Sequence, residues 1–306
     1  MRASGNNLTM KKASLHKPVL VNEVVKYLNL APGKNVIDCT FGGGGHGLEI
    51  LKCIRPDGKL LAIDADKSTG TLEHWNIGTY KNLIFVQNNF KNLKKIVKQN
   101  FSYKVNGILL DLGLSSDQLE KSGRGFSFQK DEPLDMRYDT AQELTAAQVI
   151  NSYSLENLYD VFKNYGEYPR AHLLAKSIFK RRKKKKFLTA KDLVDVILEI
   201  NKPARKKIHP ATLVFQALRI EVNDELESLK KVLPQAIDIL EKRGRLAVIS
   251  FHSLEDRIVK NYFRDLGREK KPQIKLLTKK PVRSQRQEVA ENPRSRSAKL
   301  RSIEKL

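Results

Sequence analysis

Short apolar runs alternate with helical stretches in the first third of the chain. Four runs, at 35–38, 60–64, 83–86 and 105–111, are separated by segments in which apolar residues recur at helical spacing. Near-continuous apolar runs of this length are typical of strands that are covered on both faces. The pattern predicts an α/β fold with a mostly parallel, doubly wound sheet.

The pattern changes at Ser115. From there to about Pro210 the apolar residues follow helical spacing, and Thr189 begins a capping-box sequence ahead of one amphipathic helix. No buried strand is evident in this stretch. Strand character returns at 246–249, after a helix that we expect to end at Gly244. We therefore predict a helical insertion within an α/β domain.

Segment boundaries follow from these changes. The predicted segments are a flexible N-terminal tail (1–17), a discontinuous α/β domain (18–114 and 211–306) and an inserted helical domain (115–210). From about residue 264 the chain is polar and basic, which predicts a tail with one possible edge strand near 300–303.

Composition limits the class of protein. Of the 306 residues, 40% are hydrophobic, which is enough for a core and excludes wholesale disorder. No run approaches the roughly 20 apolar residues of a membrane span, and residues 1–17 lack a secretory signal, so we expect a cytoplasmic protein. Cys39 and Cys53 are expected to be reduced thiols. The histidines show no ligand spacing, so no metal site is predicted.

The charge points to a polyanionic partner. Lys and Arg number 57 against 34 Asp and Glu, a net charge of +23, and the pI is about 9.9. Phosphate backbones reward such surfaces through counterion release. A membrane surface is a poorer candidate, because the sequence has one Trp and no amphipathic helix with an aromatic face. Nucleic acid is therefore the favoured partner.

A glycine-rich loop carries the most specific local signal. Residues 38–47 (DCTFGGGGHG) follow the first predicted strand, and Asp64 ends the second strand. Glycines allow a tight turn and a close approach of a ligand, and an acid at the second strand end can accept hydrogen bonds from ribose hydroxyls. The pair predicts a cofactor of adenosine type, either a nicotinamide dinucleotide or S-adenosylmethionine. The basic charge favours the methyl donor, because nucleic acids are common methyl acceptors.

Longer motifs resemble a known family. The motifs are HKPVL (16–20), TFGGGGH (40–46), ILLDLGLSSDQL (108–119), RGFSF (124–128), PLDMR (133–137), HPAT (209–212), FQALRIEVNDEL (215–226), SFHSLEDRIVK (250–260) and VAENPRSRSAKLR (289–301). Together, and in the same order, they resemble the bacterial small-subunit (16S) ribosomal RNA cytosine-N4 methyltransferases. The resemblance implies a Rossmann-like methyltransferase domain with an inserted helical domain that recognises RNA. It also implies S-adenosylmethionine as the cofactor, and N4-methylation of one cytosine in 16S rRNA near the decoding centre of the small ribosomal subunit.

The resemblance also implies a cofactor site. Its residues would be Gly44, Gly45 and His46 at the methionine part, Asp64 at the ribose, Phe90 at the adenine, and Asp111 with Gln118 completing the set. From the residues alone, Phe90 is equally compatible with core packing, and Gln118 reads as an ordinary loop residue.

The catalytic group stays open. The N4 amine of cytosine is a poor nucleophile, and many amino-methyltransferases supply acceptors for its protons from a D/N/S-P-P-Y/F motif. Residues 111–116 (DLGLSS) lack that motif. The candidates are Asp111, Asp135, Ser250 and His252.

Candidate RNA contacts are dispersed. They are Arg124, Arg137, Arg181, Arg182 and Arg205. The basic run at 180–186 (KRRKKKK) is denser than we expect of the family; it is either a solvated helix end or an extra phosphate contact. Two other functions stay open, a non-catalytic RNA-binding assembly factor and a nicotinamide oxidoreductase. Whether the chain is a monomer or a dimer is not predicted.

Overall fold

The strands of the described residues form one sheet. The structure is a computed structural model that describes residues 18–67, 80–201 and 209–306. The strands are β1 (Val36–Asp38), β2 (Leu60–Asp64), β3 (Leu83–Gln87), β4 (Val105–Asp111), β5 (Leu240–Ser250), β6 (Ile274–Leu276) and β7 (Lys299–Lys305), in the order β3-β2-β1-β4-β5-β7-β6. Strands β1 to β5 are parallel, and β7 is antiparallel to β5 and β6. The predicted α/β sheet is confirmed.

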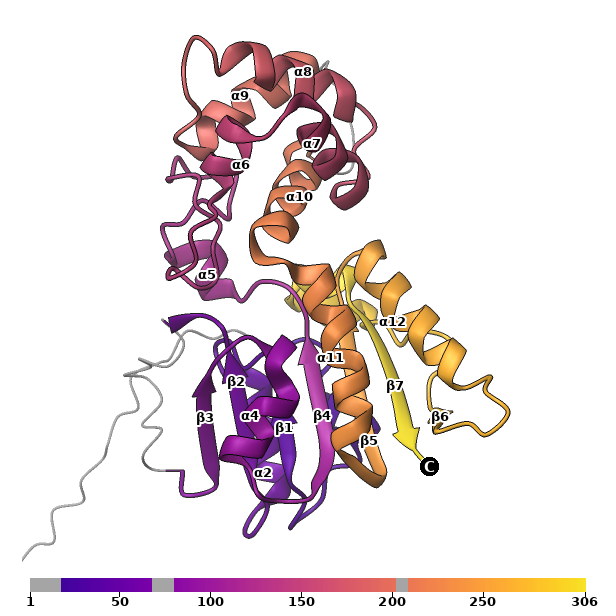
Figure 1. Cartoon of the computed structure of the whole chain (residues 1–306). Helices are drawn as coiled ribbons and strands as arrows, with labels where there is room; N and C mark the ends of the chain where they lie inside the picture. Colours follow the sequence, from indigo (N-terminus) through magenta and orange to yellow (C-terminus); the bar gives the residue numbers. More distant parts are fainter. Residues whose placement is uncertain (1–17, 68–79, 202–208) are drawn as a thin grey trace, which may run out of the picture.

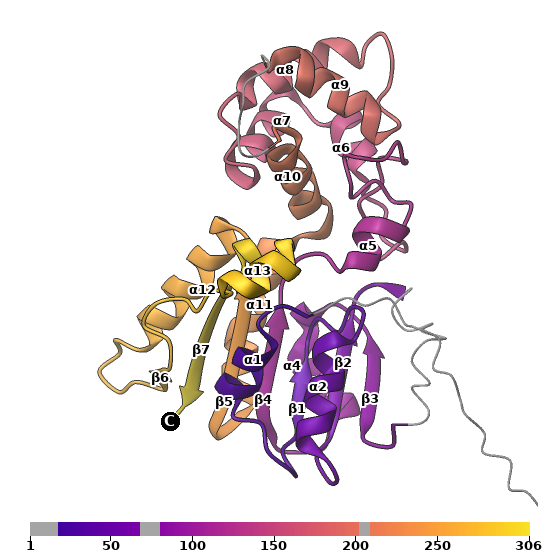
Figure 2. The ribbon, with the colours of Figure 1, turned by 180° about the vertical axis from the view of Figure 1, so that it is seen from behind.

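Helices cover both faces of this sheet (Figures 1 and 2). The helices on one face are α4 (Leu93–Asn100), α11 (Glu225–Ile239) and α12 (Ser253–Leu266), and those on the other are α1 (Val21–Leu28) and α2 (Gly45–Ile54). Neighbouring residues of one strand belong to separate cores. Leu61 lies in the core with α4, α11 and α12, and Leu60 lies in the core with α1 and α2. Alternation of side chains along each strand therefore builds two apolar layers from one continuous run.

A second group of helices forms a core of its own. Its elements are α5 (Ser116–Lys121), α6 (Ala146–Ser152), α7 (Leu155–Asp160), the π-helical turn η3 (Val161–Tyr165), α8 (Ala171–Arg181), α9 (Ala190–Ile200) and α10 (Ala211–Asn223). Val214, Phe215 and Leu218 of α10 pack into this core and into neither core of the sheet. We call the described residues 115–201 and 209–223 the helical region. It extends past residue 210, where the sequence pattern placed its end.

Helix α10 passes into α11 through a single residue. Asp224, with a φ of 50°, is at once the C-cap of α10 and the N-cap of α11. Since α10 belongs to the helical region and α11 packs on the sheet, this left-handed residue marks the junction between the two parts (Figure 1). The first turn of α11 lies near the carboxyl ends of the strands, where Glu225 and Ser228 line the same pocket as Asp64 and Asp111.

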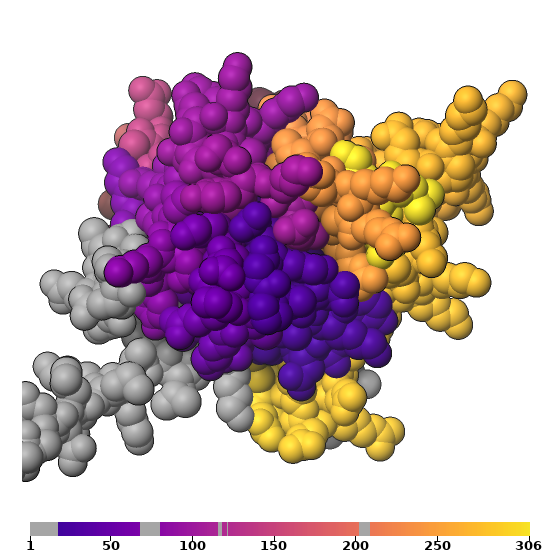
Figure 3. Space-filling model, turned by 90° about the horizontal axis from the view of Figure 1, so that it is seen from below, coloured from indigo at the N-terminus to yellow at the C-terminus, as the bar shows by residue number. Residues whose placement is uncertain are grey.

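The end of the chain is part of the sheet. Strand β7 lies between β5 and β6, so it is an internal strand and not the predicted edge strand, and β6 forms the edge. Leu300 and Ile303 are fully buried on opposite faces. Seen from below, the C-terminal residues in orange and yellow lie directly beside the indigo N-terminal ones (Figure 3). The prediction of a basic tail from residue 264 is therefore wrong.

The predicted helix end at Gly244 is wrong, and the predicted N-terminal tail is not tested. Helix α11 ends at Ile239, and Gly244 lies within β5, because Leu240 already pairs with Val105 of β4 before the register shifts. The predicted tail at 1–17 lies outside the described residues. Among the residues that are described, no helix is long and apolar enough to span a lipid bilayer.

Candidate functional site

Three adjacent parallel strands end in aspartate. Asp38 ends β1, Asp64 ends β2 and Asp111 ends β4. The sheet order places β2, β1 and β4 side by side, so the three carboxyl groups share one edge of the sheet. Ligands of open α/β sheets bind at this edge, outside the carboxyl ends of the strands.

The glycine-rich loop folds over this edge. Gly42 and Gly44 have φ values of 49° and 71°, in the left-handed region that favours glycine. Helix α2 begins at Gly45, with Gly44 as its N-cap. A Cβ on Gly47 would lie 2.4 Å from Cε2 of the buried Phe41, so that glycine is required for close packing. The loop therefore presents backbone and the start of a helix to a ligand.

Asp64 is held in place by the backbone. Its Oδ2 accepts a hydrogen bond from Gly42 N at 2.6 Å, and its Oδ1 accepts one from Asp66 N at 2.8 Å. The side chain thereby ties the end of β2 to the glycine loop on β1. Its carboxylate lines the pocket described below, in the position predicted for a ribose-binding acid.

His46 bridges the first turn of α2 and the end of β4. Its Nε2 lies 2.9 Å from the carbonyl oxygen of Val19, and its Nδ1 lies 3.3 Å from Oδ2 of Asp111. Both ring nitrogens face acceptors, an arrangement that suits the doubly protonated imidazolium. Burial alone would lower the pKa of His46, but Asp111, by its charge and its hydrogen bond, raises that pKa above the ordinary value.

Asp38 lies beneath the loop and is fully buried. Its Oδ1 accepts a hydrogen bond from Thr40 N at 3.1 Å. Burial raises the pKa of its carboxyl to about 7, although the nearby His46 works in the opposite direction. Among the described residues, Oδ2 of Asp38 and Oδ1 of Asp111 are buried acceptors without a hydrogen-bond partner. Such orphaned acceptors point to a donor that a ligand supplies.

One pocket joins most of the predicted cofactor residues. It is lined by Gly45, His46, Asp64, Phe90, Asp111 and Gln118, while Gly44 lies next to it as the N-cap of α2. Phe90 begins the 3₁₀ turn η2 (Phe90–Asn92) and is half-buried. The far wall comes from the helical region and the C-terminal segment, through Tyr138, Asn223 and Arg294. The pocket thus lies between the sheet and the helical region.

Gln118 reaches this pocket through a network that the sequence does not reveal. It completes a capping box with Ser115, and its amide nitrogen donates to Oδ2 of Asp66 at 3.0 Å. Arg124 pairs with the same carboxylate. Asp66 therefore fixes the first helix of the helical region to the end of β2. In the sequence, the only indication of this contact is the position of Asp66, an acid two residues after a predicted strand.

Of the four catalytic candidates, only Asp111 lines the pocket. Asp135 receives a double hydrogen bond from Arg137, at 2.8 and 2.7 Å. Burial opposes ionisation of Asp135, but that guanidinium outweighs it and lowers the pKa of the carboxyl, which makes it a weak base. The hydroxyl of the buried Ser250 faces the carbonyl oxygen of Lys299 at 3.4 Å.

His252 caps the N-terminus of α12. Its Nδ1 accepts the backbone N–H of Glu255 at 3.5 Å and so caps α12, and Oε2 of Glu255 accepts the N–H groups of Phe251 and His252 in return. The neutral ring must then carry its proton on Nε2, which lies 3.1 Å from Oε1 of Glu255. Burial would raise the pKa of Glu255, but His252 and Arg219 together lower it.

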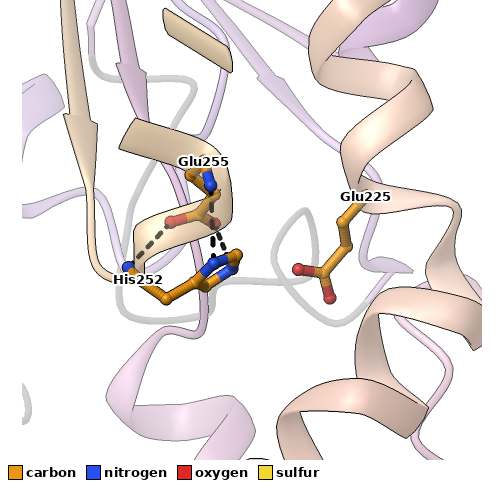
Figure 4. A group of neighbouring side chains, drawn as sticks. All are labelled: Glu225, His252 and Glu255. Carbon is orange, nitrogen blue, oxygen red and sulfur yellow. Dashed lines mark hydrogen bonds and ion pairs between the residues drawn. The ribbon is translucent and has the colours of Figure 1, made fainter. Parts of the chain in front are cut away.

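Glu225, His252 and Glu255 form one cluster whose ligand atoms lie within 4.8 Å of one another, and Figure 4 shows the Glu225 carboxylate pointing toward the His252 ring. A metal at Nε2 of His252 would have to move the ring proton to Nδ1, against the N–H that Nδ1 accepts. Both oxygens of Glu225 already bind Arg219, at 2.8 and 2.9 Å. Nε2 of His252 is buried without a hydrogen-bond partner among the described residues. Because Glu225 is already paired with Arg219 and Nδ1 of His252 caps α12, we assign the cluster no metal.

The predicted RNA-binding arginines are largely used inside the protein. Arg124 and Arg137 pair with Asp66 and Asp135. Arg181 pairs with Glu199, and Arg182 donates to the carbonyl oxygen of Ile150 at 2.8 Å. Arg205 lies outside the described residues. The structure thus gives the four described arginines intramolecular partners in place of an open phosphate contact.

Comparisons with known proteins identify the family of this chain. The sequence pattern of the MraW methylase family matches residues 13–306. The protein named ribosomal RNA small subunit methyltransferase H from Dictyoglomus thermophilum is 47% identical over 94% of this chain and 96% of its own length. The protein of the same name from Clostridium botulinum is 43% identical over 95% of this chain and 99% of its own length.

Among solved structures, a methyltransferase from Streptococcus mutans in complex with SAH has a TM-score of 0.43 and 12% identity, over 94% of this chain and 97% of its own. The family match and the near-complete alignment with relatives more than 40% identical decide the assignment. The chain belongs to the MraW methylase family.

Proposed function

We propose that this protein transfers a methyl group from S-adenosylmethionine to small-subunit ribosomal RNA, at N4 of one cytosine near the decoding centre. The observation that carries the proposal is the meeting of the glycine loop with Asp64 and Asp111 in a pocket whose far wall is the helical region. The relatives named as small-subunit rRNA methyltransferases support the substrate class. The resemblance of the long motifs to cytosine-N4 enzymes supports the atom and the position.

The residues of the pocket fit this donor. S-adenosylmethionine supplies a methyl group on a positively charged sulfur, next to an ammonium group and a nucleoside. Three strand-end carboxyl groups surround the loop, and two of their oxygens are buried acceptors with no hydrogen-bond partner in the described chain. Such a site favours a cation with N–H groups. In the proposal, Gly44, Gly45 and His46 hold the methionine part.

The remaining residues hold the nucleoside. Asp64 would accept hydrogen bonds from the ribose, because its carboxylate is oriented by two backbone N–H groups and lines the pocket. Phe90 would pack against the adenine from the half-buried turn after β3. Gln118 would close the same side, since its amide is held by Asp66. Positioning of the two reactants supplies most of the rate in such a displacement.

Asp111 is the candidate that the geometry favours for accepting a hydrogen bond from the N4 amine. It ends β4, next to the strand that carries the glycine loop, and its Oδ2 is fixed by His46. An acceptor there would draw on the amine protons and make the nitrogen lone pair available. The target base must leave its stack to reach the pocket.

The test uses the purified protein, labelled S-adenosylmethionine and small ribosomal subunits that lack the modification. We expect label on N4 of a single cytosine in the subunit RNA. Label on a ring carbon, on an adenine or on ribosomal protein would refute the N4 assignment. Transfer to none of these substrates, with donor bound, would favour a binding factor that has kept the fold.

Two variants separate the roles within the pocket. Asp111→Asn should lower the rate of transfer by about 100-fold while donor affinity falls by less than about 10-fold, because an acceptor used mainly in the transition state affects turnover. Ser250→Ala is the matched control and should leave the rate unchanged. Equal losses of rate and affinity in Asp111→Asn would restrict Asp111 to the cofactor.

A further inference from the structure

The turn between α8 and α9 is a concentrated basic surface. It belongs to the run at 180–186, and it lies in the part of the helical region farthest from the sheet (Figures 1 and 2). It is therefore remote from the pocket at the strand ends. The proposed function gives this surface no role.

Neighbouring acids neutralise only part of the run. Arg181 pairs with Glu199 of α9 at 2.7 Å, and Lys185 pairs with Asp192 at 2.8 Å. Arg182 is half-buried, with its guanidinium 4.6 Å from the centre of the Phe179 ring. These three side chains fix the turn to the helices on either side of it.

Five lysines are left over, and we call them the lysine patch. They are Lys176, Lys180, Lys183, Lys184 and Lys186, and all are exposed. Lys176 and Lys180 lie one helical turn apart on α8 and so share a face. In the described parts of the chain, no acidic side chain lies within ion-pair distance of any of the five. The surplus positive charge at this end is therefore open to an external anion.

The backbone that carries the patch is held firmly. The N–H groups of Lys184 and Lys185 donate to the carbonyl oxygen of Arg181 at 2.9 and 3.1 Å. The following Phe187 is buried and exchanges two hydrogen bonds with the side chain of Asn151, at 3.0 and 2.8 Å. The charges thus sit on an ordered turn, which lowers the entropic cost of binding an extended ligand there.

Phosphate backbone is the partner that this surface fits. Lysine ammonium groups are compact point charges on flexible stems, suited to phosphates whose positions vary, whereas the arginines of this turn are committed internally. The exposed large apolar side chains of α8, α9 and the turn between them are all leucines, Leu173, Leu188 and Leu198. The aromatic Phe179 is half-buried, with Arg182 and Lys183 over its ring, so the surface lacks the exposed aromatic anchors of a membrane-binding face.

We propose that the lysine patch is a second RNA-binding surface, which contacts the phosphate backbone of the small ribosomal subunit away from the target base. This inference rests on the proposed function, because it takes the subunit as the substrate. Binding energy gained there raises affinity for the subunit. It does not act on donor binding or on the chemical step, since neither involves that end of the molecule.

The test compares the full-length protein with the variant Lys183→Gln/Lys184→Gln/Lys186→Gln. Binding to small subunits is measured over a range of KCl concentrations. Each neutralised phosphate contributes a slope of roughly 0.7–0.9 in log K against log salt, so the slope should become shallower by about 2 to 3. Affinity at about 0.1 M salt should fall by about 10-fold or more. Donor affinity, measured with S-adenosylhomocysteine, should not change.

The matched control removes the same charge from the sheet side of the molecule. Lys95→Gln/Lys98→Gln/Lys260→Gln replaces exposed lysines of α4 and α12. A loss of affinity equal to that of the patch variant would show that net charge alone matters, and would overturn the proposal. An unchanged salt slope in the patch variant would overturn it as well.

A short RNA that carries only the target cytosine separates the two sites. We expect the patch variant and the unaltered protein to bind it equally, because it does not extend to the far end of the helical region. An equal loss on the short RNA would place the patch at the target and overturn the remote surface. Failure of the proposed function has a different signature: the unaltered protein would bind subunits with the expected salt slope but transfer no methyl group to their RNA.

Discussion

The carboxyl edge of the sheet and the far end of the helical region carry opposite charges and hold them differently. At the sheet edge, Asp38, Asp64 and Asp111 are buried or half-buried and fixed by backbone N–H groups or by His46. At the far end, the lysine patch is exposed and has no acidic partner in the described chain. A small ligand is bound by side chains that are held in one fixed geometry, whereas a chain of phosphates is bound by charged side chains that can change their position. The carboxylates at the strand ends suit the first kind of ligand, and the lysine patch suits the second.

Arginines at the α10–α11 junction and at the far end form ion pairs within the protein. Arg219 binds Glu225 in the buried junction between α10 and α11, and Arg181 binds Glu199 on the surface. Both are ion pairs of similar length, 2.8 and 2.7 Å. Their contributions to stability should differ widely, because burial and not distance decides what an uncompensated charge costs.

The largest effect should come from the buried junction. Arg219→Met leaves the carboxylate of Glu225 unpaired while its side chain is only 11% exposed, so the free energy of unfolding should fall by about 3–5 kcal/mol. Urea denaturation measures this loss. Arg219→Met/Glu225→Gln removes the charge as well and should recover part of the stability. Equal losses in the single and double variants would show that the pair is not coupled.

The next effect concerns the sheet edge. Asp64→Ala removes the proposed ribose acceptor and the group that receives Gly42 N, so affinity for S-adenosylhomocysteine should fall by about 100-fold, given about 1.5–3 kcal/mol for a hydrogen bond to a charged group. Titration calorimetry measures it. Asp195→Ala, an exposed acid on α9, is the control and should bind as before. Unchanged affinity in Asp64→Ala would remove the ribose contact from the proposed site.

The strand ends could be predicted because a short stretch of sequence is enough to indicate them. An apolar run that stops at an aspartate marks both the strand and its end, so Asp38, Asp64 and Asp111 were placed from sequence alone. Helix α10 was assigned to the wrong side of a boundary, because an amphipathic helix looks the same whichever core it packs against. Its packing into the helical core depends on contacts with distant residues.

The internal position of β7 was missed for a related reason. Arg301 and Ser302 make its sequence appear polar, yet both are buried. Arg301 pairs with Asp256 of α12 at 2.7 Å, and Ser302 N donates to the hydroxyl of Thr278 at 3.0 Å. Partners 24 or more residues away turn polar positions into interior ones, which a local pattern does not indicate. The same applies to Asp66, whose partners lie on the helical region.

A further effect should appear in the pH dependence of stability. Burial raises the pKa of Asp38 from 3.8 to about 7, so the folded protein binds this proton more tightly than the unfolded chain does. Stability attached to Asp38 is therefore present below about pH 4 and is lost as the pH rises toward 7. Asp38→Asn keeps an acceptor for Thr40 N and has no carboxyl to ionise. Relative to the unaltered protein, it should gain roughly 3–4 kcal/mol between those pH values.

Thermal unfolding across this pH range checks the prediction. Asp265→Asn, which removes an exposed carboxyl of α12, is the control, and its difference from the unaltered protein should stay nearly constant with pH. A constant difference for Asp38→Asn as well would show that Asp38 ionises normally in the folded protein. The sheet edge would then lack the buried, proton-binding character that distinguishes it from the helical region.

The smallest effect should come from the surface pair of the helical region. Arg181 and Glu199 are 43% and 62% exposed, so Arg181→Gln should change the free energy of unfolding by less than about 0.5 kcal/mol. Arg182→Gln is the matched comparison: that guanidinium donates to the carbonyl oxygen of Ile150, and its removal should cost about 1 kcal/mol. Raising KCl to roughly 0.5 M should abolish the Arg181 effect and preserve the Arg182 effect, because salt screens exposed charges far more than half-buried ones. If Arg181→Gln proved as costly as Arg182→Gln at every salt concentration, the exposed pair of Arg181 with Glu199 would stabilise the fold as much as the half-buried Arg182 does. Exposure would then not distinguish the residues of this turn that stabilise the fold from those that are open to RNA.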